Sequence, residues 1–474
     1  MYTRISLLLC GLLMFAGVVT ASIAATAATP AKAAAKAASG DIFPFQVAQT
    51  TLANGLKVIV IPYDSPGTLA YYLVVRTGSR DEVEPGHSGF AHFFEHTMIR
   101  GTDKYPADKY NDPLKKMGAD SNASTADDAT VFHIVGPSSE LTTLMDMESD
   151  RFKGLKYSED AFRTESLAVL GEYNKGVSNP VQPMFEKLRD LAFEKHTYKH
   201  TTIGFEADIK AMPGYYEYSR QFFKRFYRPE NVVLLVVGDV KPPQVFDLAK
   251  QYYGDWTPGY QAPAIAPEPP QKERKKGHLD WPNPTHPYLL VGYHMPAFST
   301  KAVDSAALDM IGDLLFSESA PLYQELVVNK QWVDLVQGGP NDNRDPGLFI
   351  VLARVKSDDL LPKVKETIDR YMQELATRPV DPKRLARNQS HERYAFALEL
   401  DTPSKVAEQV ADVISQTGDV QDINRRFAQF KKVTPADVQR LARATFRPQN
   451  ETEVTLSHPA GAPEKPAQGG DKHE

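Results

Sequence analysis

Cysteine is almost absent from this chain: Cys10 is the single one among 474 residues. It lies in an apolar stretch near the N-terminus that we expect to be missing from the mature protein. A mature chain without cysteine can form neither a disulfide nor a thiolate metal site. We therefore expect its stability to come from packed cores.

A strong charge of one sign is lacking as well. The chain carries 54 Lys and Arg against 60 Asp and Glu, a formal net charge of −6, so we expect no general attraction to a phosphate backbone or to anionic lipid and no nucleic-acid partner. With 42% hydrophobic and 24% charged residues, the composition is typical of globular rather than disordered or fibrous protein. At roughly 100 to 200 residues per domain, the length favours several domains.

Long apolar runs are lacking too, apart from one at residues 5–16. This run follows Arg4 and precedes small residues, an order typical of a secretory signal peptide, and it is short for a membrane span. We predict a signal peptide at residues 1–24, a periplasmic location and no stable membrane span after cleavage; an uncleaved anchor is the alternative. Residues 25–42 and 457–474 have few core residues and are predicted to be flexible tails.

A Pro-rich and charged stretch divides the remaining chain. Residues 258–277 are predicted to be a linker between a domain at 43–257 and a second domain at 278–456. The segment Tyr-Arg-Pro-Glu-Asn, which begins at Tyr227, recurs as Phe-Arg-Pro-Gln-Asn from Phe446. This echo indicates a duplicated domain of about 200 residues.

Strand and helix patterns alternate in both halves. We predict strands at residues 46–52, 56–62, 69–76, 130–135, 232–237, 288–294 and 348–355, and helices at 88–100, 138–152, 158–175, 303–316 and 360–375. Ser138 and Ser158 are expected to cap two of the helices. The predicted fold class is α+β, with two homologous domains whose mixed or antiparallel sheets are packed with helices.

The most informative segment runs from His92 to His96, with Glu95 before the second histidine. On a helix, residues four apart share a face, so both imidazoles can reach one metal ion. Glu95 would lie beside that ion, where its carboxylate can accept a proton from the water that the metal activates. This H-x-x-E-H order is the reverse of the commoner zinc-peptidase helix. The alternative is a pair of surface histidines on an amphipathic helix.

A catalytic zinc takes a third protein ligand and keeps one position open. Glu165 and Glu172 are seven residues apart and therefore share one helical face, but this spacing does not choose between them. Glu148, Asp150 and Glu159 are further candidates.

These segments resemble the pitrilysin family of inverted zincins, which includes insulin-degrading enzyme and the mitochondrial processing peptidase. The resemblance rests on His92 to His96, Arg100-Gly101-Thr102, Asn122 to Thr125 and the pair Glu165 and Glu172. It implies that Glu172 is the third ligand of one Zn²⁺ per chain, and that Glu165 supports the site without binding the ion. It also implies two duplicated α+β halves joined by a linker.

The resemblance further implies that Asn122, Ala123, Ser124 and Thr125 form an exposed edge strand that pairs with the main chain of a peptide substrate. The alternative is a polar turn. His133, His196 and His200 are expected to be structural rather than metal-binding.

The second half departs from the family pattern. The family carries a Leu-Arg pair there with a Tyr seven residues after the Arg, and this pair grips the substrate. Here Val327 stands in place of the Arg and Asp334 in place of the Tyr. The resemblance therefore implies a heterodimer with a related subunit that lacks the metal motif and supplies both side chains; the alternative is a homodimer that uses other donors.

The sequence thus predicts a secreted zinc metalloendopeptidase that hydrolyses peptides or unfolded segments. A non-catalytic peptide-binding or assembly subunit of the same fold is the alternative from another class. Glu95 argues against that alternative, because a purely structural subunit has no need of a general base.

Overall fold

A computed structural model describes residues 41–459 of the chain. The predicted signal peptide at 1–24 and Cys10 lie outside the described residues. So do nearly all of the predicted tail at 25–42 and most of the one at 457–474. Within the described part, no helix combines the length and the apolar character that a membrane span requires.

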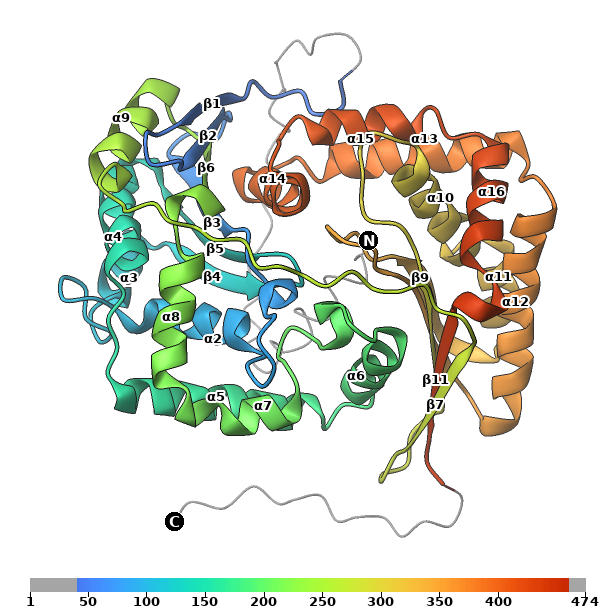
Figure 1. Ribbon diagram of the computed structural model, residues 1–474. Helices are drawn as coiled ribbons and strands as arrows, with labels where there is room; N and C mark the ends of the chain where they lie inside the picture. The colour runs from blue at the N-terminus through green and yellow to red at the C-terminus, as the bar shows by residue number, and fades with distance from the viewer. Residues whose placement is uncertain (1–40, 460–474) are drawn as a thin grey trace, which may run out of the picture.

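The first half contains a six-stranded sheet in the order β1-β2-β6-β3-β5-β4 (Figure 1). β2 and β6 are parallel, and the other neighbours are antiparallel. The central strands are apolar on both faces, as expected for a sheet covered on both sides. The strands are β1 (Ala48–Thr51), β2 (Lys57–Pro62), β3 (Thr68–Val75), β4 (Asp120–Thr125), β5 (Thr130–Pro137) and β6 (Val232–Gly238).

The second half repeats this arrangement with a five-stranded sheet in the order β7-β11-β8-β10-β9. Its one parallel pair, β7 and β11, corresponds to β2 and β6. The predicted α+β duplication is therefore confirmed. The strands are β7 (Lys275–Asp280), β8 (Tyr288–His294), β9 (Val333–Pro340), β10 (Leu348–Val355) and β11 (Glu451–Ser457).

The sequence echo has a structural cause. Asn231 donates from its side-chain amide to the carbonyl of Phe226 at 3.0 Å, and Asn450 donates in the same way to the carbonyl of Thr445 at 2.8 Å. Both carbonyls belong to the last residue of a helix and have no partner within it. In each half the repeated segment, which begins at Tyr227 or Phe446, therefore lies between the end of a helix and the next strand, and its asparagine caps the helix end.

The helices agree with most of the predicted ranges. Ser158 caps its helix by accepting a hydrogen bond from the backbone N–H of Ala161 at 3.1 Å. The prediction for Ser138 is wrong, because a 3-10 turn at Ser138–Glu140 precedes the helix and moves its start to Leu141. The helices are α2 (Phe90–Thr97), α3 (Asn111–Met117), α4 (Leu141–Gly154), α5 (Glu159–Gly176), α6 (Val181–Ala192), α7 (Glu206–Ala211), α8 (Tyr216–Phe226), α9 (Pro242–Tyr253), α10 (Asp304–Phe316), α11 (Pro321–Tyr323), α12 (Leu361–Thr377), α13 (Pro382–Leu398), α14 (Pro403–Thr417), α15 (Asp422–Phe430) and α16 (Pro435–Thr445).

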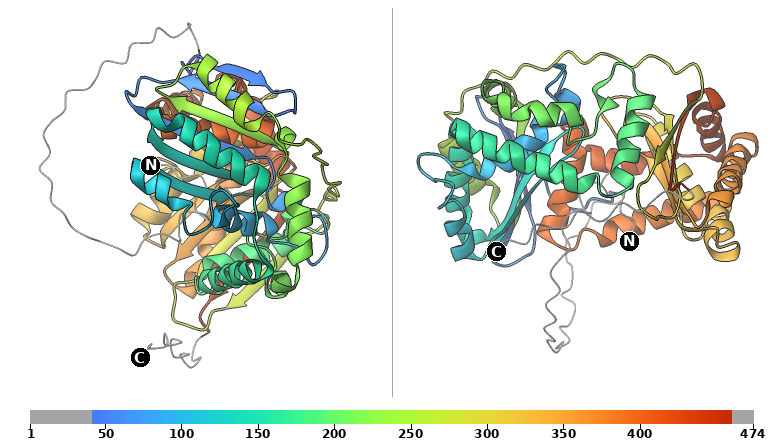
Figure 2. Two further views of the ribbon diagram at one scale, coloured as in Figure 1. Left: turned by 90° about the vertical axis from the view of Figure 1, so that its left-hand side faces the viewer. Right: turned by 90° about the horizontal axis from the view of Figure 1, so that it is seen from below.

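Each half contributes one helix to the sheet of the other half. α14, from the second half, packs Val410 and Ile414 against the inner face of the first sheet, and α6, from the first half, packs Met184 and Leu188 against the second sheet. Figure 2 shows the two halves side by side from below, with these helices between them. The halves are thus joined by shared apolar cores as well as by the chain connection.

The connection between the halves runs across one face of the molecule (Figure 1). Residues 256–274, all within the described part of the chain, form neither helix nor strand, and β7 begins at Lys275, inside the predicted linker range. Glu268 holds the connection in place, because its carboxylate accepts backbone N–H groups from Glu194, Lys195 and His196 at 2.8 to 2.9 Å.

Candidate metal centre

The start of α2 is fixed by two features. Gly89 precedes the helix with φ of +93°, and a Cβ there would lie 2.5 Å from the carbonyl oxygen of Ile203, so glycine is required. The fully buried carboxylate of Glu82 accepts the backbone N–H groups of Gly89 and Ala91 at 2.8 and 2.6 Å. A carboxylate at a helix N-terminus is favourable because it satisfies free N–H groups and complements the helix dipole.

The two faces of α2 have different roles. Phe90, Phe93 and Phe94 are buried in the core of the first half. His92 and His96 lie one turn apart on another face, with ring centroids 4.8 Å apart. Burial of the phenyl rings therefore sets the rotation of the helix and points the histidines toward α5.

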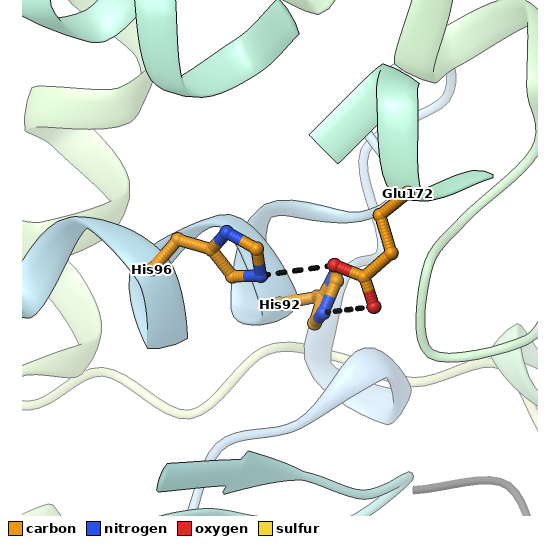
Figure 3. Close-up of side chains that lie close together, drawn as sticks. All are labelled: His92, His96 and Glu172. Atoms are coloured by element: carbon orange, nitrogen blue, oxygen red, sulfur yellow. Dashed lines mark ion pairs between the residues drawn. The ribbon is translucent and has the colours of Figure 1, made fainter. Parts of the chain in front are cut away.

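Glu172 of α5 meets both histidines (Figure 3). Its carboxylate oxygens lie 3.6 Å from Nε2 of His92 and 3.1 Å from Nε2 of His96. Within residues 41–459, these three side chains form a group whose ligand atoms all lie within 4.8 Å of one another. Zinc ligands at about 2.0 to 2.2 Å in tetrahedral geometry are roughly 3.3 to 3.6 Å apart. The donor set, two imidazole nitrogens and one carboxylate oxygen, fits such an ion and leaves a fourth position open.

The electrostatics of the group favour a cation. Burial lowers the pKa of His92, which keeps its imidazole neutral and able to bind a metal. Burial also acts to lower the pKa of His96, but hydrogen bonds to Glu165 and Glu172 raise it to about 10. Burial acts to raise the pKa of Glu172, yet its hydrogen bond with His96 holds that pKa below its usual value. Glu172 therefore stays ionised, and the positive charge that faces it is the protonated ring of His96, which must lose its proton when a metal ion takes its place.

Glu165 lies behind His96 rather than beside the other ligand atoms. Its carboxylate is 3.1 Å from Nδ1 of His96, while Nε2 of the same ring faces Glu172. Arg100 donates from Nε to the other oxygen of Glu165 at 2.5 Å. A carboxylate on the far nitrogen orients a metal-binding imidazole. The geometry thus gives the two acids, which spacing alone did not separate, different positions.

Glu95 and the predicted edge strand also meet. Within residues 41–459, β4 lies at the edge of the sheet and pairs with β5 alone, so the interpretation of its sequence as a polar turn is wrong. Thr125, the last residue of β4, donates from its hydroxyl to Glu95 at 2.6 Å. Asn122 accepts the backbone N–H of Ala123 at 2.9 Å.

The rival ligands are engaged elsewhere. Glu148 pairs with Arg151 and accepts the hydroxyl of Tyr110, and Asp150 accepts the hydroxyl of Thr102. Glu159 forms an exposed ion pair with Arg163. The three histidines expected to be structural also have contacts elsewhere: His133 stacks on Tyr72, His196 lies 3.0 Å from Asp345 and Nδ1 of His200 faces the carbonyl of Thr201.

The two departures from the family pattern lie in the second half. Val327 packs against the core there, and Asp334 forms an ion pair with Arg354 at 2.7 Å. Sequence reasoning assigned no role to Glu82, to Arg100 or to the hydroxyl of Thr125. The contacts of these three groups join different segments of the chain, whereas the motif from His92 to His96 is recognised from residue spacing along a single helix.

The fold and this group of residues define a family. The chain belongs to the insulinase family, peptidase family M16: residues 58–205 match the family model described as Insulinase (Peptidase family M16), and residues 216–391 match the one described as Peptidase M16 inactive domain. The first of these matches contains the motif from His92 to His96, and the second covers much of the half in which Val327 and Asp334 lie.

Several known proteins are similar over most of their length. The zinc protease PqqE of Helicobacter pylori is 28% identical over 421 residues, which cover 86% of this chain and 91% of that protein. A probable mitochondrial-processing peptidase subunit beta of Arabidopsis thaliana is 22% identical, covering 83% of this chain and 75% of that protein. A crystal structure of a protease from Helicobacter pylori has a TM-score of 0.82 at 27% identity, covering 88% of this chain and 100% of that one.

Proposed function

We propose that this protein is a secreted zinc metalloendopeptidase that hydrolyses peptides or unfolded segments. His92, His96 and Glu172 would hold one Zn²⁺ per chain. The observation that carries the proposal is the convergence of their three ligand atoms within 4.8 Å, with an acid next to the second histidine. When bound, zinc lowers the pKa of a water molecule and polarises the scissile carbonyl.

The remaining chemistry belongs to side chains of this chain. Glu95 accepts the proton of the attacking water on its carboxylate and later passes it to the leaving amine. Glu165 holds the ring of His96 through Nδ1, so that Nε2 keeps its direction. Arg100 holds Glu165 in turn.

Substrate binding is proposed at the free edge of β4, which includes Asn122, Ala123, Ser124 and Thr125. A strand at the edge of a sheet presents unpaired N–H and C=O groups, to which an extended peptide can add as a further strand. Such binding reads main chain rather than side chains. It therefore suits unfolded segments of varied sequence, and it excludes peptide bonds within folded domains.

A second subunit is proposed because Val327 and Asp334 replace the substrate-gripping pair of the family. We expect a related chain without the metal motif to form a heterodimer with this one and to supply an Arg and a Tyr. Co-expression with such a chain should raise peptidase activity well above that of the isolated protein. Full activity of a verified monomer would contradict this part of the proposal, and activity that follows the assembly of a homodimer would favour the alternative.

The location is proposed from the N-terminal apolar run. A signal peptide at residues 1–24 would export the chain, and we expect the mature protein in the periplasmic fraction. Fractionation followed by N-terminal sequencing tests this. Recovery of the full chain in the cytosol would contradict it.

The central experiment compares the native protein with Glu95→Gln in zinc content and in cleavage of a quenched fluorescent peptide. Zinc should be retained, because Glu95 is not among the three converging ligands. Hydrolysis should fall by about 10²- to 10⁴-fold, the range associated with loss of a general base. Glu159→Gln is the matched control, since this exposed acid pairs with Arg163 one turn along the same helix, and it should leave both measurements unchanged. Equal cleavage by Glu95→Gln and the native protein would refute the mechanism and favour the non-catalytic alternative.

A further inference from the structure

Thr125 makes a side-chain contact that its place in the proposed substrate strand does not require. It is the last residue of β4 and is 2% exposed. Its hydroxyl donates to Oε2 of Glu95 at 2.6 Å. A hydrogen bond from a hydroxyl to a carboxylate is stronger and shorter than one between neutral groups. The strand that would receive the substrate therefore contacts the proposed general base directly.

The position of Thr125 is held from two sides. Its backbone pairs with Thr130 of β5, and the turn between them is closed by the N–H of Ala126 donating to the carbonyl of Ala129 at 2.8 Å. Threonine is also restricted at χ1, because two heavy atoms branch from its Cβ. A hydroxyl on such a side chain is a fixed donor rather than a mobile one.

The turn itself is fixed by charged groups from both halves. Asp127 accepts two hydrogen bonds from Arg189, at 2.7 and 2.9 Å. Asp128 accepts the backbone N–H of Arg344, from the second half, at 2.9 Å. Both acids are buried, so breaking these contacts would leave an unpaired charge away from water and is costly. Thr125 is thus anchored to a rigid part of the interface between the halves.

We propose that Thr125 is a positioning residue for Glu95, an inference that rests on the proposed peptidase function. Its hydroxyl engages Oε2 and fixes the plane of the carboxylate, which leaves Oε1 to take the proton of the attacking water. Because Thr125 ends the substrate strand, the peptide and the base are held by one element. This places the peptide bond and the proton acceptor in a constant relation, which is the geometric requirement for efficient proton transfer.

Thr125→Val tests the proposal, because it keeps the shape of the side chain and removes the hydroxyl. Thr125→Ser is the rescue variant, since it keeps the hydroxyl and removes the methyl group. Thr130→Val is the matched control: Thr130 is the cross-strand neighbour, is 1% exposed and donates its hydroxyl to the carbonyl of Thr77, away from Glu95. Each variant is compared for zinc content, thermal midpoint, kcat and KM in the preparation that cleaves peptide, with the related subunit included where one is required.

The expected result is a fall in kcat of about 10- to 100-fold for Thr125→Val, the size associated with a misplaced catalytic group. KM and zinc content should stay within about threefold of the native values. Thr125→Ser should recover most of kcat, and Thr130→Val should lower the thermal midpoint without a comparable loss of kcat. A rise in KM with unchanged kcat would instead assign Thr125 to substrate binding alone. That result, or equal loss in Thr125→Val and Thr125→Ser, would overturn the proposal.

A structural measurement separates this proposal from the proposed function. In crystals of the zinc-free Thr125→Val protein, the carboxylate of Glu95 should leave the place it holds in the native protein, while in Thr125→Ser it should keep it. An unmoved Glu95 in Thr125→Val would overturn the positioning role whatever the activity. If Glu95 moves but the native protein with zinc and its partner cleaves no peptide, the contact stands and the peptidase function fails.

Discussion

Replacing Glu165 with glutamine tests whether the proposed metal site depends on an acid outside the three converging ligands. Glu165 lies 3.1 Å from Nδ1 of His96, and its side chain is 5% exposed. Glutamine keeps the length and one acceptor oxygen but removes the negative charge. The imidazole then keeps only a neutral hydrogen-bond acceptor and loses the negative charge that increases its basicity and strengthens its orientation.

The magnitude follows from this contact. Loss of a partner behind a metal ligand weakens metal affinity by about 10- to 100-fold, or about 1.4 to 2.7 kcal/mol. The effect should be near the upper end, because burial limits screening by water and because Arg100 would also lose its anionic partner. Glu159 lies on the same helix, exposed and paired with Arg163, so Glu159→Gln should change zinc affinity by less than about twofold.

Competition with a chromophoric zinc chelator at pH 7 measures these affinities, and thermal unfolding of the zinc-free proteins checks that both variants fold. A dissociation constant of Glu165→Gln within twofold of the native value would refute the reasoning. So would an equal loss in Glu159→Gln, which would point to the overall charge of α5 rather than to the contact with His96.

Two further predictions concern the scaffold. Ile414→Ala, on the helix that covers the sheet of the other half, should lower the free energy of unfolding by about 2 to 5 kcal/mol in chemical denaturation, because Ile414 is fully buried. The control Leu398→Ala, at a site that is 76% exposed, should change that free energy by less than about 0.5 kcal/mol. Equal effects of the two substitutions would contradict the packing of α14. Gly89→Ala should reduce both stability and zinc content, because its added Cβ would meet a backbone carbonyl at 2.5 Å and its φ is +93°. Gly154→Ala is the control, because its added Cβ meets nothing within 4 Å, and this variant should bind zinc normally. Normal zinc binding by Gly89→Ala would contradict the prediction and show that the start of α2 can shift to accept the side chain.

Local sequence patterns predicted much of the secondary structure. The strand at 232–237 was predictable from its continuous apolar run, and the helices at 158–175 and 303–316 from their helical apolar patterns, with Ser158 as a cap for the first of them. The start of α4 was not, because Ser138 is itself the first residue of a 3-10 turn that precedes the helix, and the sequence pattern does not distinguish such a turn from the first turn of an α-helix. The echo at Tyr227 and Phe446 revealed the duplication, since an asparagine that closes a helix is needed in each copy.

Packing between segments was not visible in the sequence. The apolar stripes of α6 and α14 predict burial, but they do not say which sheet each helix covers. In the structure both helices cross to the other half. The reason is that an apolar face is satisfied by any apolar partner of suitable shape, and the choice depends on the whole chain.

The sequence by itself placed His92, Glu95 and His96 together, because residues three and four apart on one helix are neighbours whatever surrounds them. Only the tertiary structure decided which acid meets both imidazoles, where the carboxylate of Glu165 lies, and which hydroxyl contacts Glu95. Those contacts join segments 30 to 80 residues apart, and their distances are set by the packing of α5 and β4 around α2 rather than by any local rule of the backbone.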